Sequence, residues 1–333
     1  MKKNKTSLLR SADGVSFLLP FAMVASLFLL WGFAHGLLDV LDKHFQNTLH
    51  VSKAESGMVQ FSLYIGYLVM AGPAGSFMKR YGYQKGIILG LLLFAAGAFL
   101  IYPAAKLAAF IPFLLALFVI ACGLSTIETA ANPYTTILGP PDGAARRINI
   151  AQSFNGMGWI LGPLIGGMLI FGATRKEGSE TFDSLVTPYL WIGGIVLLVC
   201  GLFAMKKLPI VPEANQEGIT ENATLGELFR HRGFVLAVIA QFLYVAAQTG
   251  INSFFINYVT ETTTGVQATV SAWMEHMGRF GRIFMPRNPE QAASLILALG
   301  GMGSFWIGRL SAAYIMKFVS PPRLLALYAA MNT

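Results

Sequence analysis

The sequence predicts an all-α polytopic membrane protein with eight complete transmembrane helices and the start of a ninth. Of its 333 residues, 55% are hydrophobic and only 12% are charged, about half the charged share of a soluble domain. The mean hydropathy is +0.59, and a water-soluble fold of this size cannot bury so much apolar surface. The apolar runs are also long enough to cross a bilayer, where only helices or closed barrels satisfy the backbone.

Eight apolar runs have spanning length. They cover 17–41, 56–78, 84–104, 108–138, 148–172, 188–205, 233–258 and 291–316. A ninth run opens at Leu324 and continues to Thr333. The first run follows a basic segment and lacks a small-residue cleavage site, so we expect a retained span and not a signal peptide.

The basic residues predict the orientation. If the N-terminus is cytoplasmic and the spans alternate, two thirds of the 24 Lys and Arg residues fall on inner segments, counting Arg309 among them. This distribution satisfies the positive-inside rule. It also explains the net charge of +8, so the sequence predicts no nucleic-acid partner.

A long polar stretch over 206–232, with two prolines and four glutamates, interrupts the apolar pattern. We interpret it as a cytoplasmic linker. The predicted domains are an N-terminal six-helix bundle over 1–205 and an incomplete C-terminal bundle over 233–333. Parallel six-helix repeats are typical of the major facilitator fold.

A second polar stretch, 260–290, falls on the outer side as an insertion. Within it, Ser271–Phe284 places apolar side chains at helical spacing: Trp273, Met277, Phe280 and Phe284. We expect one short amphipathic helix lying in the membrane interface.

Two carboxyl side chains, Asp39 and Glu128, are predicted to be the only ones inside the spans. An ionisable group at membrane depth costs at least about 2.5 kcal/mol, so it is a candidate functional group by default. We assign both to proton coupling, because a proton removes the buried charge. Two alternatives stay open: Asp39 could be interfacial, with Asp42 and Lys43 just beyond it, and Glu128 could lie on a solvated face.

Polar side chains accompany both acids at helical spacing. Trp31, His35 and Asp39 are four residues apart, as are Glu128 and Asn132, so each set shares a helix face. Amides, carboxylates and an aromatic face together suit a polyhydroxyl ligand. The candidate substrate-binding residues are Asp39, Gln152, Asn155, Asn132, Gln248, Trp31, His35 and Asn252. Gln241 shares one face of the seventh span with Gln248 and Asn252. Alternatively, the amides hold helices together, and His35 is structural or part of the proton path.

Several kinds of chemistry lack their motifs. There is no Gly-rich nucleotide loop, no Cys/His set with metal spacing and no nucleophile elbow. We expect no cofactor, no metal and no enzymatic activity. An acid–base enzyme built on Asp39 and Glu128 would lack a nucleophile.

Several segments resemble the fucose:proton symporter family of the major facilitator superfamily. They are Leu-Trp-Gly-Phe-Ala at 30–34, Leu-Asp-Val at 38–40, Gly-Ser-Phe-Met-Lys-Arg at 75–80, Ile-Glu-Thr-Ala-Ala-Asn-Pro at 127–133, Ala-Gln-Ser-Phe-Asn at 151–155 and Val-Ala-Ala-Gln-Thr at 245–249. The resemblance extends over nearly the whole chain.

The resemblance implies a sugar carrier in the bacterial cytoplasmic (inner) membrane. In that family the residues matching Asp39 and Glu128 couple proton to sugar, and those matching Gln152 and Asn155 line the sugar cavity. Family members carry L-fucose, glucose, galactose or other hexoses. This chain has His35-Gly36 where fucose carriers have two asparagines, and Leu38 where they have another.

The leading hypothesis is therefore proton-coupled symport of a monosaccharide by alternating access, by a monomer in the bilayer. Members of the resembled family have twelve helices, whereas this chain stops at the start of the ninth, so we expect about a hundred residues of that pattern to be absent on the span arithmetic. A truncated, non-transporting remnant or a sugar sensor is the alternative. Translation of the downstream DNA separates the two.

Overall fold

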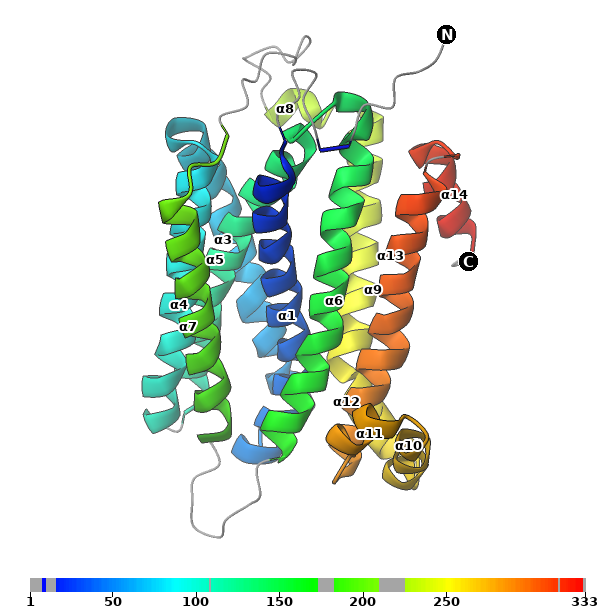
Figure 1. The fold of residues 1–333 in the computed structure, drawn as a ribbon. Coiled ribbons are helices and arrows are strands. Elements are labelled where there is room, and N and C mark those ends of the chain that lie inside the picture. Colours follow the sequence, from blue (N-terminus) through cyan, green and yellow to red (C-terminus); the bar gives the residue numbers. More distant parts are fainter. Residues whose placement is uncertain are drawn as a thin grey trace.

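A computed structural model describes residues 8–9, 16–107, 109–172, 183–209, 225–316 and 318–331, and these form helices joined by short connections (Figure 1). Eight helical segments in this part of the chain are long and apolar enough to cross a membrane. The predicted count of eight spans is thus confirmed, and the short helix α14 (Pro321–Met331) stands where the ninth begins.

The first six spans are formed by single helices: α1 (Leu18–Leu49), α3 (Met58–Tyr81), α4 (Tyr83–Leu107), α5 (Phe110–Ile137), α6 (Ala144–Gly172) and α7 (Asp183–Met205). The seventh is α9 (Arg232–Thr262), and the eighth is built from α12 (Pro289–Leu295), the π-helical η2 (Ile296–Met302) and α13 (Gly303–Ile315). The short connecting helices are α2 (Lys53–Ser56), η1 (Pro141–Gly143), α8 (Leu225–Leu228), α10 (Val266–Glu275) and α11 (Gly278–Ile283).

The helices form two groups that meet along α1 and α6. In the first group α1 packs on α6, while α4 packs on α5 and α7. In Figure 1 the second group, α9 with α12 and α13, lies on the other side of α1 and α6. Most of the predicted linker 206–232 lies outside the described residues, which here include 206–209 and α8.

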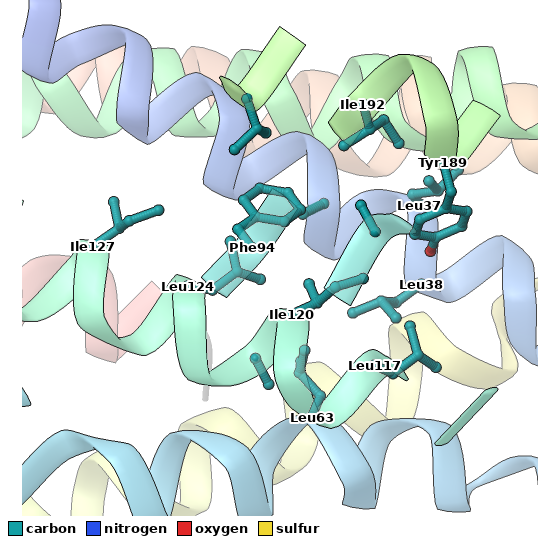
Figure 2. Packing of buried hydrophobic residues seen from close by; sticks show 14 of the residues in the cluster. Leu37, Leu38, Leu63, Phe94, Leu117, Ile120, Leu124, Ile127, Tyr189 and Ile192 are labelled. Carbon is teal, nitrogen blue, oxygen red and sulfur yellow. The ribbon is translucent and has the colours of Figure 1, made fainter. Parts of the chain in front are cut away.

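The apolar core of the first group lies between α1, α4, α5 and α7. Figure 2 shows Phe94 of α4, Ile120 of α5, Leu37 of α1 and Tyr189 of α7 directed toward one another. Leu38 is directed into the same core and is 2% exposed. The next residue, Asp39, faces a polar cavity, so successive residues of α1 lie in an apolar and a polar environment.

Close packing of α1 against α6 depends on glycine. A Cβ atom placed on Gly162 would lie 2.6 Å from the carbonyl carbon of Gly36 and 2.7 Å from its Cα. Both partners are backbone atoms, which cannot turn aside as a flexible side chain can. Gly162 therefore marks a site of close helix packing.

Helix α1 is longer than predicted, and this changes the inventory of buried acids. It continues to Leu49 instead of ending near residue 41. Asp42, expected just beyond the span, lies inside the helix and has no exposed surface. The prediction that only two carboxyls lie within the spans is therefore wrong. Hydropathy summed along the sequence ends a span at the first polar cluster, whereas here that cluster faces other helices.

The predicted amphipathic helix over 271–284 is also wrong in form. Two helices, α10 and α11, occupy the region, and Gly278, the first residue of α11, has a left-handed φ of 59°. The buried face of α10 contains Met274, whereas Trp273 is 47% exposed. The chain turns at the glycine, and packing against α12 selects a face different from the predicted one.

A polar cavity between the two helix groups

A cavity of about 370 Å³ lies where the two helix groups face each other. Helices α1, α3, α5, α6, α9 and α13 contribute its walls. Its lining residues are Trp31, His35, Asp39, Gln60, Tyr64, Tyr67, Glu128, Gln152, Asn155, Trp159, Gln241, Tyr244, Val245, Gln248, Thr249, Asn252, Phe305 and Arg309. All the candidate residues named from the sequence are in this set except Asn132.

The first wall is the α1 stripe of Trp31, His35 and Asp39. The Trp31 and His35 rings are edge-on, with centroids 5.7 Å apart. His35 Nδ1 lies 3.0 Å from the Trp31 carbonyl oxygen, which can only accept, so this nitrogen carries a proton. The other neighbours of the imidazole are the rings of Trp159, at 5.6 Å, and Tyr67, at 5.8 Å. His35 is thereby held in one orientation by aromatic groups.

Each of the two predicted carboxyls has an amide neighbour instead of a cation. Asp39 is 3% exposed, and its Oδ1 accepts a long hydrogen bond of 3.5 Å from Gln60 Nε2. Glu128 Oε1 accepts from Asn132 Nδ2 at 3.4 Å. Among the described residues, neither carboxyl has a basic group within 4.0 Å. An anionic carboxylate in this setting is stabilised only by weak dipoles, and a bound proton removes the cost of its charge.

A chain of hydrogen bonds connects Glu128 to the second helix group. Asn132 receives a bond from Gln152 Nε2 at 3.4 Å, and Gln152 Oε1 accepts from Arg309 Nη1 at 3.3 Å. Asn132 therefore lies behind the cavity wall and joins Glu128 to Gln152. Through Arg309 of α13, the hydrogen bonds that begin at a carboxyl on α5 reach the opposite helix group.

Asn155 is oriented differently from the other amides. It is 2% exposed, and its Nδ2 donates to the Phe28 carbonyl of α1 at 3.4 Å. This contact fits the alternative interpretation of the amides, in which Asn155 holds two helices together instead of binding a substrate.

Sequence reasoning missed part of the lining, and Arg309 most clearly. It was counted with the inner basic residues, yet it lies within α13 with its guanidinium carbon 4.4 Å from the Phe305 ring centroid. A charged residue inside the predicted span 291–316 was the available signal. Gln60, Tyr64 and Tyr67 were also missed, although their spacing of four and three places them on one face of the second span.

Several buried polar atoms around the cavity lack a hydrogen-bond partner among the described residues. They are Trp31 Nε1, Asp39 Oδ2, the Tyr67 hydroxyl and Arg309 Nε. Buried polar groups are normally paired, so donors and an acceptor are available here for a ligand. The volume is within the usual range of about 300–1,000 Å³ for small-molecule sites.

Comparison with known proteins gives a consistent assignment. The family model described as Major Facilitator Superfamily matches residues 15–331. The chain is 35% identical to the L-fucose-proton symporter of Escherichia coli strain K12, covering 94% of this chain and 71% of that protein. It is 36% identical to a glucose/galactose transporter of Brucella abortus biovar 1 (strain 9-941), covering 74% of this chain but only 60% of the relative.

The fold agrees with a solved relative. A crystal structure of the E. coli fucose:proton symporter FucP matches with a TM-score of 0.69 at 33% identity, covering 94% of this chain and 74% of that chain. The relatives are transporters. Carriers of this architecture bind their substrate between two helix bundles, and this chain has its polar cavity between two helix groups. The chain therefore belongs to the Major Facilitator Superfamily and is a relative of its L-fucose-proton symporter.

Proposed function

We propose that the protein is a proton-coupled symporter of a monosaccharide, L-fucose or a related hexose, that works by alternating access. The observation that carries this proposal is the cavity itself. It combines two carboxyls without basic partners, a set of amides and tryptophan faces, and it lies between two helix groups. The names of the relatives, a fucose-proton symporter and a glucose/galactose transporter, support the same substrate class.

The lining supplies the contacts that a sugar needs. Hydrogen bonds with the sugar hydroxyl groups come from Asp39, Gln152 and Gln248. Asn252, one turn after Gln248 on α9, adds a further amide. The faces of Trp31 and Trp159 cover the apolar C–H side of the ring. Asn132 acts behind the wall by orienting Glu128 and Gln152, and Asn155 mainly holds α1 to α6.

Proton coupling follows from the cost of a buried charge. With Glu128 ionised, its carboxylate holds Asn132, Gln152 and Arg309 in one arrangement through the chain of hydrogen bonds. A proton on Glu128 weakens that attraction and frees the second helix group to move once sugar has bound. Only the carrier loaded with both then changes conformation readily.

We further propose the topology that the charge distribution predicts. The N-terminus and the connection between α7 and α9 are cytoplasmic, and the turn between α1 and α3 is outside. The six spans over 1–205 form one bundle, 206–232 is the linker, and 233–333 contributes to the second bundle. The membrane is the bacterial inner membrane, and the working unit is a monomer.

Substitution of Glu128 by Gln tests the coupling. In proteoliposomes with an imposed inward proton gradient, the wild-type protein should accumulate a radiolabelled hexose against its concentration gradient. E128Q should retain sugar exchange but lose accumulation, because glutamine cannot carry a proton. Asp142, an exposed acid in η1, gives the control variant D142N, which should behave as wild type.

Two results would contradict the proposal. Proton-driven accumulation by E128Q would remove Glu128 from the coupling. Saturable sugar binding by the wild-type protein without uptake under any gradient would indicate a binding protein instead of a carrier.

A further inference from the structure

The end of α1 farthest from its N-terminus forms a polar seam with α9. Lys43 Nζ donates to Asn257 Oδ1 at 3.0 Å, and the Tyr64 hydroxyl lies 2.8 Å from Thr249 Oγ1. An ion pair between Lys53 and Glu261, 2.7 Å long, closes the edge of this seam. These contacts join the first helix group to the second, on the outer side in the proposed topology.

Asp42 lies inside the seam and has no function in the mechanism above. It is fully buried, and neither of its carboxyl oxygens has a hydrogen-bond partner among the described residues. The polar side chains nearest to its carboxyl group on neighbouring helices are those of Ser253 on α9 and Gln60 on α3. Ser253 is 3% exposed, and its hydroxyl is also without a hydrogen-bond partner among the described residues. Two orphan polar groups from opposite helix groups therefore stand side by side.

No cation neutralises Asp42 in the described part of the chain. Asp39, one turn earlier on α1, is the charged group that acts on it, and its charge has the same sign. Nearby titratable groups have partners of their own: Lys43 bonds Asn257, His44 contacts Thr48, Lys53 pairs with Glu261, Glu55 bonds Ser52, Tyr64 contacts Thr249, Glu128 bonds Asn132, and the His35 ring lies among those of Trp31, Tyr67 and Trp159. Arg146 and Arg147 lie in the first turn of α6, at the other end of the molecule.

The chemistry of this pair depends on one proton. An ionised Asp42 in the closed seam would be a desolvated anion beside a second carboxyl, which is strongly unfavourable. A protonated Asp42 gains a donor, so its O–H can bond Ser253 Oγ while Ser253 donates back to the carbonyl oxygen. The proton comes from the outer solution when the seam is open and leaves to water when it opens again.

We infer that Asp42 is a second proton-binding carboxyl of the transport cycle, which allows α1 and α9 to close on the outer side only when it is protonated. The direction of this effect rests on the proposed function. Asp42 is not among the residues that line the cavity, so it is a positioning residue for the cavity and not part of the sugar site.

The experiment measures closure of the seam as a function of pH. Spin labels at Ala54 and Thr264, both exposed and on opposite sides of the Lys53–Glu261 pair, report the distance in a variant whose two native cysteines are replaced. The wild-type closed population should rise as the pH falls. In D42N the closed-to-open ratio at alkaline pH should rise at least tenfold, and the pH dependence should lose the slope of one proton.

Two further variants make the result specific. S253A should keep the slope but shift closure to lower pH, because it removes the partner of the protonated carboxyl. D142N should match the wild type throughout. A pH dependence of closure in D42N equal to that of the wild type would overturn the inference. So would closure that follows sodium when sodium replaces choline at constant pH, because the group would then bind a metal cation.

The failure of this inference is distinguishable from failure of the proposed function. Sugar-induced proton uptake, followed with a pH indicator in the same proteoliposomes, tests symport alone. If the wild-type protein carries out symport and D42N closes with the wild-type pH dependence, only the role of Asp42 is rejected. If closure depends on Asp42 but the wild-type protein does not transport sugar, only the symporter function is rejected.

Discussion

Single side chains decide whether the connection between α5 and α6 holds together, and Arg147 is the clearest case. It is fully buried, and its guanidinium donates to five carbonyl groups: those of Leu8, Thr135, Thr136, Gly139 and Pro140. The last carbonyls of a helix have no partner within the helix. Arg147 binds those of α5 and attaches the connection to α6.

Replacing Arg147 by Met should lower the free energy of unfolding by about 2–4 kcal/mol, because buried carbonyls lose their donors. Arg147→Lys should lose less, since it keeps the charge but not the planar fork. Thermal unfolding of the purified protein in detergent measures both. The partly exposed neighbour gives the control variant R146M. Equal stability of R147M and R146M would contradict the structural role of Arg147.

At the scale of elements, the contact between α1 and α6 positions the cavity. Both helices place lining residues next to their glycines: His35 precedes Gly36, and Trp159 lies one turn before Gly162. A change in the helix separation therefore moves the imidazole and the indole together. Stability and sugar binding are coupled at this contact.

Gly162→Ala should lower the free energy of unfolding by about 1–3 kcal/mol, because the added methyl group meets the backbone of Gly36 and the helices must separate. Sugar affinity, measured by equilibrium binding, should fall in parallel. The control is Gly194→Ala in α7, where a Cβ would meet nothing within 4 Å. That variant should be neutral or slightly stabilised, as alanine favours helix. A G162A protein as stable as G194A would show that the contact can adjust freely.

For the whole molecule, the question is what holds the two helix groups in the arrangement observed. The Lys53–Glu261 pair spans the groups, but its side chains are 56% and 47% exposed. Exposed pairs contribute little and are screened by salt. We therefore expect the buried contacts of the seam, and not this ion pair, to dominate the closed state.

A double-mutant cycle with K53M and E261Q on the spin-labelled protein checks this expectation. The coupling between the two side chains in seam closure should be small at low salt and should decline further at high salt. Uptake should remain near the wild-type level in both single variants. A large coupling, or one insensitive to salt, would assign the pair a larger share of the closed state.

Much of this architecture was predictable because membrane spans have a local signal. The eight spans and the face shared by Trp31, His35 and Asp39 follow from hydropathy and helical spacing alone. Asp42 was not recognised as buried, and Arg309 was not recognised as a cavity residue. A hydropathy pattern does not distinguish helix surfaces that face lipid, water or protein. The environments of these two residues are made by α6 and α9, which are distant in sequence.

The sequence by itself determined that the chain is a bundle of membrane-spanning helices, because the backbone in lipid must satisfy its own hydrogen bonds and long apolar runs leave no other solution. It also singled out Glu128, since a charge inside an apolar run is costly wherever the helix packs. Only the tertiary structure decided which polar groups share the cavity, that Asn132 lies behind its wall, and that Asp42 faces Ser253. Those facts depend on the rotation of each helix and on its neighbours, and both are set by packing between segments far apart in the chain.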